Sequence, residues 1–545
     1  GGYFDSGSTW TTNSLTETRN DDYNVTSQAI ANYMGTFGSH NLTVMAGFEN
    51  YYMKSESLGA ARDKYELTGY PYLNIGSEDF QTNSGTGSEY TSNSVFGRVI
   101  YSYADRYLFQ ANVRHDGSSR FAKGYRWGTF PSFSAGWVAS EEKFMKNLKW
   151  DWLSFLKLRG SWGMLGNERI GSNYFPYIAL MSFGNSLFYM ADGSVVSDKT
   201  ARPAVLAVED ITWETTTSTD LGLDVNFLNN RLQFHFDYYW KETKDMLLNI
   251  EIPYFMGYNN PSTNAGKMST HGYDIEVAWN DQIGDFKYGV NVNFSDFLSK
   301  IDYMNDGEQI SGGKIKRAGV LFNEFYGYVC EGIYQTQEEV NNSARTSTTV
   351  TVGDLKYRDI SGPDGVPDGV ISPEYDRVPL GNSLPRFQYG GSLNASYKGI
   401  DFSLAFQGIG KQNSYLSTSM VQPLRDNYGN VPAILEGKYW SPFNTTEENL
   451  AAKYPRLSNV SKSNNYATSN FWMFNGSYFR LKNITLGYTL PKSWTQKAGI
   501  NRARFYVSGS DLFCLSNFPS GWDPEMGTSD YPITTSLVMG IQVNF

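Results

Sequence analysis

The sequence predicts an all-β protein, a transmembrane antiparallel β-barrel, from three observations. Its predicted strands alternate between apolar and polar residues. The short connections between strands fall on one side of the membrane and the long ones on the other, and the last residues of the chain form an alternating strand. In that strand one face carries Leu537, Met539, Ile541, Val543 and Phe545. Successive side chains of a strand point to opposite faces, so this strand has one apolar face and one largely polar face. A strand of this kind that ends on an aromatic residue is typical of bacterial outer-membrane barrels, where it closes the barrel and serves barrel assembly.

Composition agrees with this fold and excludes a helical membrane protein. The chain has 545 residues, of which 18% are charged and 16% are aromatic, and aromatic rings suit strands and membrane interfaces. Mean hydropathy is -0.44, and no apolar run approaches the ~18 residues that a membrane-spanning helix needs. In a β-barrel, lipid-facing and lumen-facing residues alternate, so a low mean hydropathy is compatible with a membrane location.

Charge and the reactive side chains exclude further classes of protein. The net charge is -10, and since Lys and Arg do not cluster, we expect no nucleic-acid partner. The four histidines are scattered and no spacing singles out a pair of carboxylates, so we expect no enzyme. Cys330 and Cys514 have no metal-ligand spacing, and whether they form a single disulfide stays open.

The strands are counted backwards from Phe545, which is placed at the periplasmic end. The clearest predicted strands cover residues 503–510, 479–488, 400–407, 288–294 and 232–240. Short connections then fall on the periplasmic side, at residues 37–40, 103–106, 229–230 and 398–399. Long segments fall outside the cell, near 53–91, 166–217, 241–270, 298–386 and 411–476. A soluble glycan-binding β-protein, which is an alternative, has no reason to sort its loops in this way. The total is roughly 15 or 16 strands of membrane-spanning length.

One periplasmic connection, residues 140–155, is longer than the others. It begins with SEEKFMKN, in which Ser140 is the expected N-cap and Glu141 and Glu142 lie in the first turn. This pattern predicts a short helix.

Several long stretches resemble the SusC/RagA-type TonB-dependent transporters of Bacteroidetes outer membranes. The clearest is SVFGRVIYSYADRYLFQANVRHDGSSRF, followed by RWGTFPSFSAGW, between Ser94 and Trp137. Further stretches that carry the resemblance are EEKF, LKLRGSWGMLGN, GDLKYRD, VPLGNSLPRFQY, GSYFRLKNITLGYTL and, near the end, GWDPE. The resemblance covers nearly the whole chain.

The resemblance implies a location in the outer membrane of a Gram-negative bacterium and a barrel of about 22 strands. Residues 1–545 would then be the C-terminal part of that barrel, since the signal peptide, TonB-contacting segment and plug of the family are not visible in this sequence. The implied function is TonB-dependent import of a large nutrient, an oligosaccharide or a peptide, with TonB acting through the N-terminal region. A SusD-like surface lipoprotein is the implied partner. The alternative is a SusC-like barrel that serves as a structural subunit of a larger outer-membrane assembly without transport. Substrate identity and oligomeric state cannot be read from the sequence.

Two groups of residues are candidate ligand contacts. Arg114, Asp116 and Arg120 are expected near the outer rim, although a polar hairpin in which Asp116-Gly117 makes the turn is the preferred interpretation. Trp440 and Trp472 belong to a long loop and could stack on sugar rings. Packing inside the loop or a place at the membrane interface would explain these two tryptophans equally well.

The segment DISGPDGVPDGVI suggests one cofactor, calcium. Asp359, Asp364 and Asp368 lie between glycines in a predicted extracellular loop, as oxygen ligands do in calcium-binding loops. The segment departs from EF-hand spacing because Pro363 stands where a ligand is expected. An Asx-rich turn in water explains the three aspartates equally well.

Overall fold

The structure is a computed structural model that describes residues 13–148, 150–170, 174–305, 307–418, 421–425, 431–527 and 531–545. The chain divides into two compact units. The first contains Gly1–Ala135, Trp162–Thr217 and Thr243–Ala265, and the second contains Gly136–Ser161, Ser218–Glu242 and Gly266–Phe545.

Fifteen strands in the described part of the chain belong to one sheet, in which neighbours follow chain order. This number agrees with the roughly 15 or 16 strands predicted from the sequence. They are β1 (Ser14–Phe37), β2 (His40–Asp63), β3 (Gln81–Tyr103), β4 (Tyr107–Ser118), β5 (Trp127–Val138), β6 (Leu153–Asn167), β9 (Glu214–Phe227), β10 (Leu232–Asn249), β11 (Ser262–Ile283), β12 (Phe286–Met304), β19 (Arg386–Tyr397), β20 (Ile400–Lys411), β23 (Tyr478–Thr489), β24 (Arg502–Ser516) and β25 (Ser536–Asn544).

The alternation predicted for these strands is present in the structure. In β25, Met539 is 74% exposed and Ile541 is 63% exposed, and both lie on the strand's apolar face. Contiguous apolar surface of this kind is unfavourable in water but suits the hydrocarbon of a membrane. We call the opposite, polar face of the sheet the inner face.

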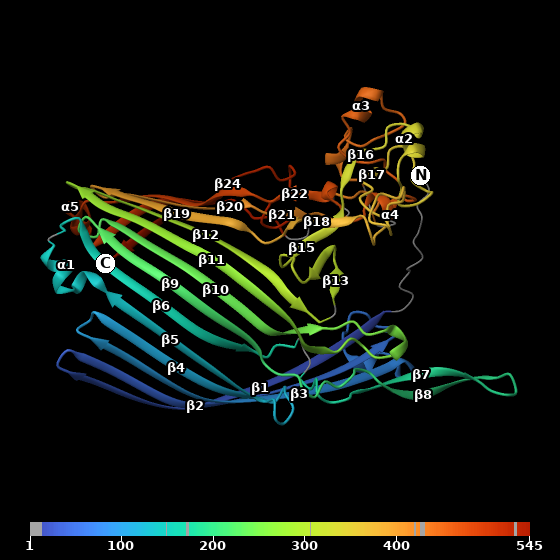
Figure 1. The fold of residues 1–545 in the computed structure, drawn as a ribbon, viewed down its shortest axis with the longest axis horizontal. Coiled ribbons are helices and arrows are strands. Elements are labelled where there is room, and N and C mark those ends of the chain that lie inside the picture. The colour runs from blue at the N-terminus through green and yellow to red at the C-terminus, as the bar shows by residue number, and fades with distance from the viewer. Residues whose placement is uncertain are drawn as a thin grey trace. The chain divides into compact units, whose positions relative to one another are not determined.

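Tight turns join the hairpins at the predicted places. In the first unit, β1 and β2 are joined by Gly38-Ser39, where Gly38 has φ +63°, and Ala104–Arg106 joins β3 to β4 at the same end of that unit (Figure 1). In the second unit, Asn229 and Asn230 have φ values of 57° and 63° between β9 and β10. Positive φ at successive turn residues matches the twist of a two-stranded hairpin and favours Asn and Gly.

The short helix after β5 forms, but Ser140 does not cap it. Helix α1 spans Lys143–Asn147 and its N-cap is Glu142, which has extended backbone. Residues Ala139–Glu141 form a 3-10 turn in which the Glu142 N–H donates to the Ala139 carbonyl at 3.1 Å. Because that turn already contains Ser140, the α-helix begins only after it, and the predicted cap was wrong.

The remaining helices are one or two turns long. They are α2 (Gln337–Asn342), α3 (Thr446–Leu450), α4 (Lys462–Asn465), α5 (Lys492–Thr495) and the 3-10 turns η1 (Leu73–Ile75), η2 (Glu78–Phe80), η3 (Ala139–Glu141), η4 (Tyr254–Met256), η5 (Ala433–Leu435), η6 (Asn470–Trp472) and η7 (Gln496–Ala498). In the described part of the chain, no helix has the length and apolar character needed to cross a membrane.

The long connections contain small sheets of their own. The hairpin of β7 (Met181–Tyr189) and β8 (Val195–Pro203) follows β6. The connections after β12 and β20 form three further sheets from β13 (Glu308–Ser311), β14 (Lys314–Arg317), β15 (Glu324–Tyr328), β16 (Cys330–Ile333), β17 (Leu355–Tyr357), β18 (Arg377–Asn382), β21 (Asn413–Tyr415) and β22 (Met473–Asn475).

Much of the buried apolar packing lies in these connections. In the first unit, Phe121, Ile211 and Trp213 pack together with Phe130 and Ile170. In the second unit, the fully buried Trp472 packs with Tyr328, Leu355, Tyr357 and Ile371. The connections are therefore folded bodies with their own cores.

A buried carboxylate holds the connections of the second unit together. Asp354 has no exposed surface, and its Oδ1 accepts hydrogen bonds from Arg456 Nε at 2.7 Å and Asn465 Nδ2 at 3.0 Å. Its Oδ2 accepts from Ser461 Oγ at 2.8 Å and from the Thr351 N–H at 2.9 Å. Asp354 thus joins the connection after β12 to the connection after β20.

Candidate functional site

Charged side chains meet across the inner face of the second unit. Arg159 of β6 donates from Nη2 to Asp237 Oδ2 of β10 at 2.6 Å and from Nε to Asp224 of β9 at 3.3 Å. Asp224 also contacts Lys157 Nζ at 3.7 Å and His235 Nδ1 at 3.0 Å. Charge-assisted hydrogen bonds to one guanidinium tie three neighbouring strands together.

A glycine on the middle strand makes room for this arginine. A Cβ built on Gly222 of β9 would lie 2.6 Å from both Arg159 Nη1 and Asp237 Oδ1. Any other residue at that position would therefore occupy the space through which Arg159 reaches β10. The same arrangement recurs at Gly487 of β23, over which Arg504 of β24 reaches Asp401 of β20, with Nε 2.9 Å from Oδ1.

A third arginine joins two neighbouring strands of the sheet, β12 and β19. Arg386, at the start of β19, makes two bonds of 2.5 Å to the carboxylate of Asp296 on β12. The Phe387 N–H adds a bond to Asp296 Oδ1 at 3.2 Å. This bidentate pair fixes β19 next to β12.

Two of the stretches that carry the family resemblance meet at Arg480. Arg480 is 3% exposed, and its guanidinium donates from Nη2 to both carboxylate oxygens of Asp523 at 2.7 Å and from Nε to Glu525 at 2.5 Å. Arg480 belongs to the stretch GSYFRLKN, and Asp523 and Glu525 belong to GWDPE. The pairing joins two stretches that are more than 40 residues apart in the sequence.

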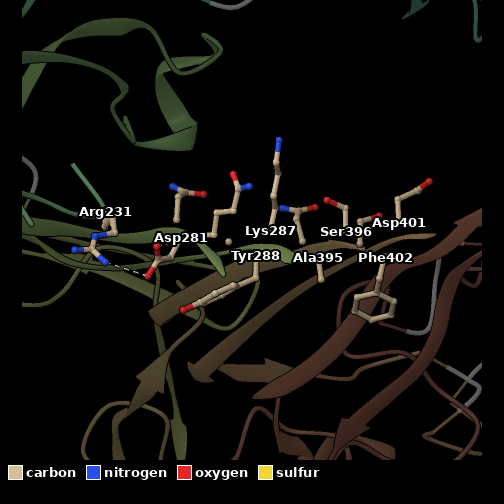
Figure 2. Close-up of a pocket in the computed structure, with 13 residues that line it drawn as sticks. Arg231, Asp281, Lys287, Tyr288, Ala395, Ser396, Asp401 and Phe402 are labelled. Carbon is tan, nitrogen blue, oxygen red and sulfur yellow. Dashed lines mark hydrogen bonds and ion pairs between the residues drawn. The ribbon is translucent and has the colours of Figure 1, made fainter. Parts of the chain in front are cut away.

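A hollow of 720 Å³ opens on the turn end of the inner face of β11, β12, β19 and β20. Figure 2 shows Lys287, Ser396 and Asp401 on one side of the sheet, and the rings of Tyr288 and Phe402 on the other. Arg231 and Asp281 form an ion pair of 3.3 Å at its margin. The hollow offers hydroxyl, amide and charged groups to a polar occupant.

A second, smaller cavity of 250 Å³ lies at the loop end of the same unit, between β12 and the connection that contains β15 and β18. Glu324, Arg386 and Lys411 are its charged lining residues. Glu324 Oε2 already accepts from the Leu321 N–H at 3.1 Å, and Arg386 is paired with Asp296. The inner face therefore offers charged and polar groups at both ends of its strands.

The residues predicted at the outer rim lie within the first unit, and the turn predicted there was wrong. Asp116 and Gly117 are residues of β4, paired with Ser94 and Asn93 of β3. A Cβ on Gly117 would lie 2.8 Å from the Trp127 ring. Gly117 therefore makes room for an aromatic side chain, and the β4–β5 turn lies further on, at residues 119–126.

Arg114 and Arg120 are both engaged within the protein. Arg114 donates to Asp116 Oδ1 at 2.7 Å and to Glu49 Oε1 at 3.0 Å. The guanidinium of Arg120 lies 4.4 Å from the ring centroid of Tyr174, a cation–π geometry. Their role in ligand binding stays a prediction.

The two candidate tryptophans are buried in the loops. Trp472 has no exposed surface, and its Nε1 donates to the Asn465 carbonyl at 2.7 Å. Trp440 is 9% exposed and its Nε1 donates to Gln335 Oε1 at 3.3 Å. Both rings pack the loops in this conformation, and stacking on a sugar stays a prediction.

The three aspartates predicted to bind calcium lie in one loop, and two of them bond to its backbone. Asp359 Oδ2 accepts from the Gly369 N–H at 2.7 Å, and Asp368 Oδ1 accepts from the Val370 N–H at 2.9 Å. Within the described ranges, no three His, Cys, Asp or Glu residues form a group that could hold a metal ion. Calcium at Asp359, Asp364 and Asp368 stays a prediction, as does the assembly role of the C-terminal strand.

Both cysteines are free thiols. Cys330 is in β16 and Cys514 is in β24. Burial raises the pKa of the Cys330 thiol to about 11, so this thiol is protonated and unreactive at neutral pH.

The charged residues that organise the inner face and the loops were missed by sequence reasoning. Arg159, Asp354 and Arg480 become recognisable only when the strand register brings residues distant in the sequence together. The sequence does contain one hint of these contacts, a glycine at an inner-face position such as Gly222 or Gly487. The hint can be used only when the strand register shows which side chain lies over the glycine.

These features together define an outer-membrane β-barrel protein: an apolar face for lipid, a polar inner face, and folded connections opposite the tight turns. Residues 1–508 match the family described as TonB dependent receptor-like, beta-barrel, and the chain belongs to that family.

Relatives agree with this assignment and confirm the resemblance to SusC-type proteins. The chain is 30% identical to TonB-dependent receptor P3 of Formosa agariphila over 96% of this chain and 52% of that protein. It is 28% identical to TonB-dependent receptor SusC of Bacteroides thetaiotaomicron over 96% of this chain and 50% of that protein. The chain thus spans about half the length of these curated relatives.

A solved structure shares the fold. The structure described as that of the RagAB peptide transporter superposes with a TM-score of 0.79 at 24% identity, covering 97% of this chain and 56% of that chain. The sequence-based prediction of an outer-membrane barrel is therefore confirmed.

Proposed function

We propose that the protein to which this chain belongs imports a large nutrient, an oligosaccharide or a peptide, across the outer membrane with energy from TonB. The observation that carries the proposal is the polar inner face, which offers charged and amide groups at both ends of its strands. The relatives named as TonB-dependent receptors support the energy source, and the RagAB peptide transporter supports a large substrate. The proposed function includes no chemical step.

A SusD-like surface lipoprotein is the proposed partner. The hairpin β7–β8 supports the proposed partner, because several of its apolar side chains are exposed and are not covered by the described part of the first unit. Phe183, Leu187 and Tyr189 alternate along β7 and are 80%, 70% and 84% exposed, and Val195 lies opposite Tyr189. An exposed apolar patch of this kind on a loop marks a surface for another protein.

Co-purification tests the partner. In the full-length protein, the double variant Phe183→Ser and Tyr189→Ser should reduce recovery of the surface lipoprotein at least tenfold. The control is Ser182→Ala, which alters the opposite face of the same strand and should leave recovery unchanged. If the double variant recovers as much lipoprotein as the unaltered protein does, the hairpin is not part of the interface.

Uptake in a strain without TonB tests the transport itself. A structural subunit without transport, the alternative function, predicts the same uptake with and without TonB. Import predicts that uptake of the substrate stops when either TonB or this protein is removed.

A further inference from the structure

Strand β25 is the last strand of the sheet, and one of its two edges is unpaired within the described residues. It pairs with β24 from Arg502–Asn544 to Ser510–Ser536, and β24 is its only neighbour among the described strands. Backbone N–H and C=O groups have no water to bond with in the hydrocarbon of a membrane, so such an edge needs a further strand. The side chains near this edge indicate how that strand is held.

A tyrosine elsewhere in the second unit shows the geometry. Tyr389 of β19 is paired with Gly408 of β20, and its ring lies over that glycine, where a Cβ would overlap it. The side chain of Tyr389 thus crosses over β20, and its hydroxyl donates to the Tyr478 carbonyl of β23 at 3.2 Å. Tyr478 is the neighbour of Phe479, with which Gly408 is paired. Tyr389 thus joins two strands that are not adjacent.

Tyr506 lies over a glycine of the next strand in the same way at the end of the sheet, but on the inner face, whereas Tyr389 lies on the apolar face. It is paired with Gly540 of β25, and a Cβ on Gly540 would lie 2.5 Å from both Cζ and Oη of Tyr506. On its other side Tyr506 is paired with Gly487, but that space is taken by Arg504, which reaches Asp401. The Arg504 guanidinium lies 5.1 Å from the Tyr506 ring centroid. Tyr506 is therefore directed across β25 toward the free edge.

We propose that Tyr506 is a bridging tyrosine: its hydroxyl donates to a backbone carbonyl of the strand that pairs with the free edge of β25. By the geometry of Tyr389, the acceptor is next to the residue that pairs with Gly540. The strand belongs to the same polypeptide, in the part of the relatives' length that this chain does not span. This inference rests on the barrel fold and is independent of import.

Heat-modifiable migration of the full-length protein on SDS gels tests the hydrogen bond. Tyr506→Phe keeps the ring over Gly540 and removes only the hydroxyl, so the barrel still folds. We expect it to lower the temperature at which the folded band disappears, by a shift similar to that of Tyr389→Phe. The control is Tyr488→Phe, which removes a hydroxyl from the apolar face of β23 and leaves the temperature unchanged. A Tyr506→Phe protein that behaves like Tyr488→Phe would overturn the proposal.

Photo-cross-linking identifies the strand. A benzophenone amino acid in place of Tyr506 in the full-length protein should yield a linked peptide pair in which both peptides come from one polypeptide. A product with the mass of two copies, a link to a different protein, or no cross-link would overturn the proposal.

Discussion

Arg159 and Asp237 form an ion pair, Nη2 to Oδ2 at 2.6 Å, although β9 lies between their strands in the sheet. The guanidinium passes over Gly222, and the same relation joins Arg504 to Asp401 over Gly487. At these two places an inner-face glycine therefore makes room for an arginine that connects two strands separated by a third.

Replacing Gly222 with valine should destabilise the barrel, because the new side chain would occupy the space of Arg159 and Asp237. Overpacking of this kind costs about 1–3 kcal/mol, and the displaced arginine loses charge-assisted bonds as well. The measurement is the temperature at which the folded band of the full-length protein is lost. Gly184→Val is the control, since a Cβ there meets nothing within 4 Å. Equal transition temperatures for the two variants would contradict the account.

Replacing Asp354 with alanine should loosen the connections of the second unit. The change removes the acceptor of five hydrogen bonds, and bonds to a charged group contribute roughly 1.5–3 kcal/mol each. Limited proteolysis of the full-length protein should show faster cleavage in the segments that contain β16 and α4. Asp151→Ala, at an exposed position of the same unit, should leave the cleavage rate as in the unaltered protein. If both variants are cleaved alike, Asp354 does not hold these segments together.

Alkylation should report the burial of Cys330. Burial raises its pKa to about 11, so at pH 8 only about one thiol in a thousand is the reactive thiolate, against roughly a quarter for an unperturbed thiol. The rate of labelling by iodoacetamide should rise about tenfold for each pH unit up to about pH 11 and then level off. Mass spectrometry of the Cys330 peptide measures it, with urea-unfolded protein as the control. Rapid labelling of the folded protein at pH 8 would be inconsistent with a buried thiol.

Removal of calcium tests the prediction made for Asp359, Asp364 and Asp368. A bound ion would hold the loop closed, so EGTA should increase protease cleavage between residues 358 and 377, and added calcium should reverse the effect. The variant Asp359→Asn should be cleaved at the faster rate under both conditions. Cleavage that does not change with EGTA would favour the turn interpretation, in which Asp359 and Asp368 bond only to backbone N–H groups.

The strands and their tight turns could be predicted from the sequence, because both depend on local residue patterns. The alternation of Leu537 to Phe545 and the pair Asn229-Asn230 can each be recognised within a few residues. The error at Asp116-Gly117 has a physical cause: glycine is common in turns, but here it makes room for Trp127. A single sequence does not distinguish these two uses of glycine.

The site could not be predicted in the same way, because its contacts join residues far apart in the chain. Asp354 and Arg456 are 102 residues apart, and Arg504 and Asp401 are 103 apart. Nothing in the local sequence of Asp354 indicates that it is buried. Trp440 and Trp472 illustrate the same difficulty, since the sequence left open whether they pack the loop or stack on a ligand, and the structure shows both packed in the loop.

The most direct test of the proposed function is uptake by intact cells that carry the full-length protein. Labelled oligosaccharides and peptides would be supplied to three strains: the unaltered strain, one without this protein, and one without TonB. Import predicts that at least one compound accumulates in the unaltered strain and in neither of the others. If the protein is folded in the outer membrane and every compound accumulates equally in all three strains, the account is contradicted and a structural subunit is favoured.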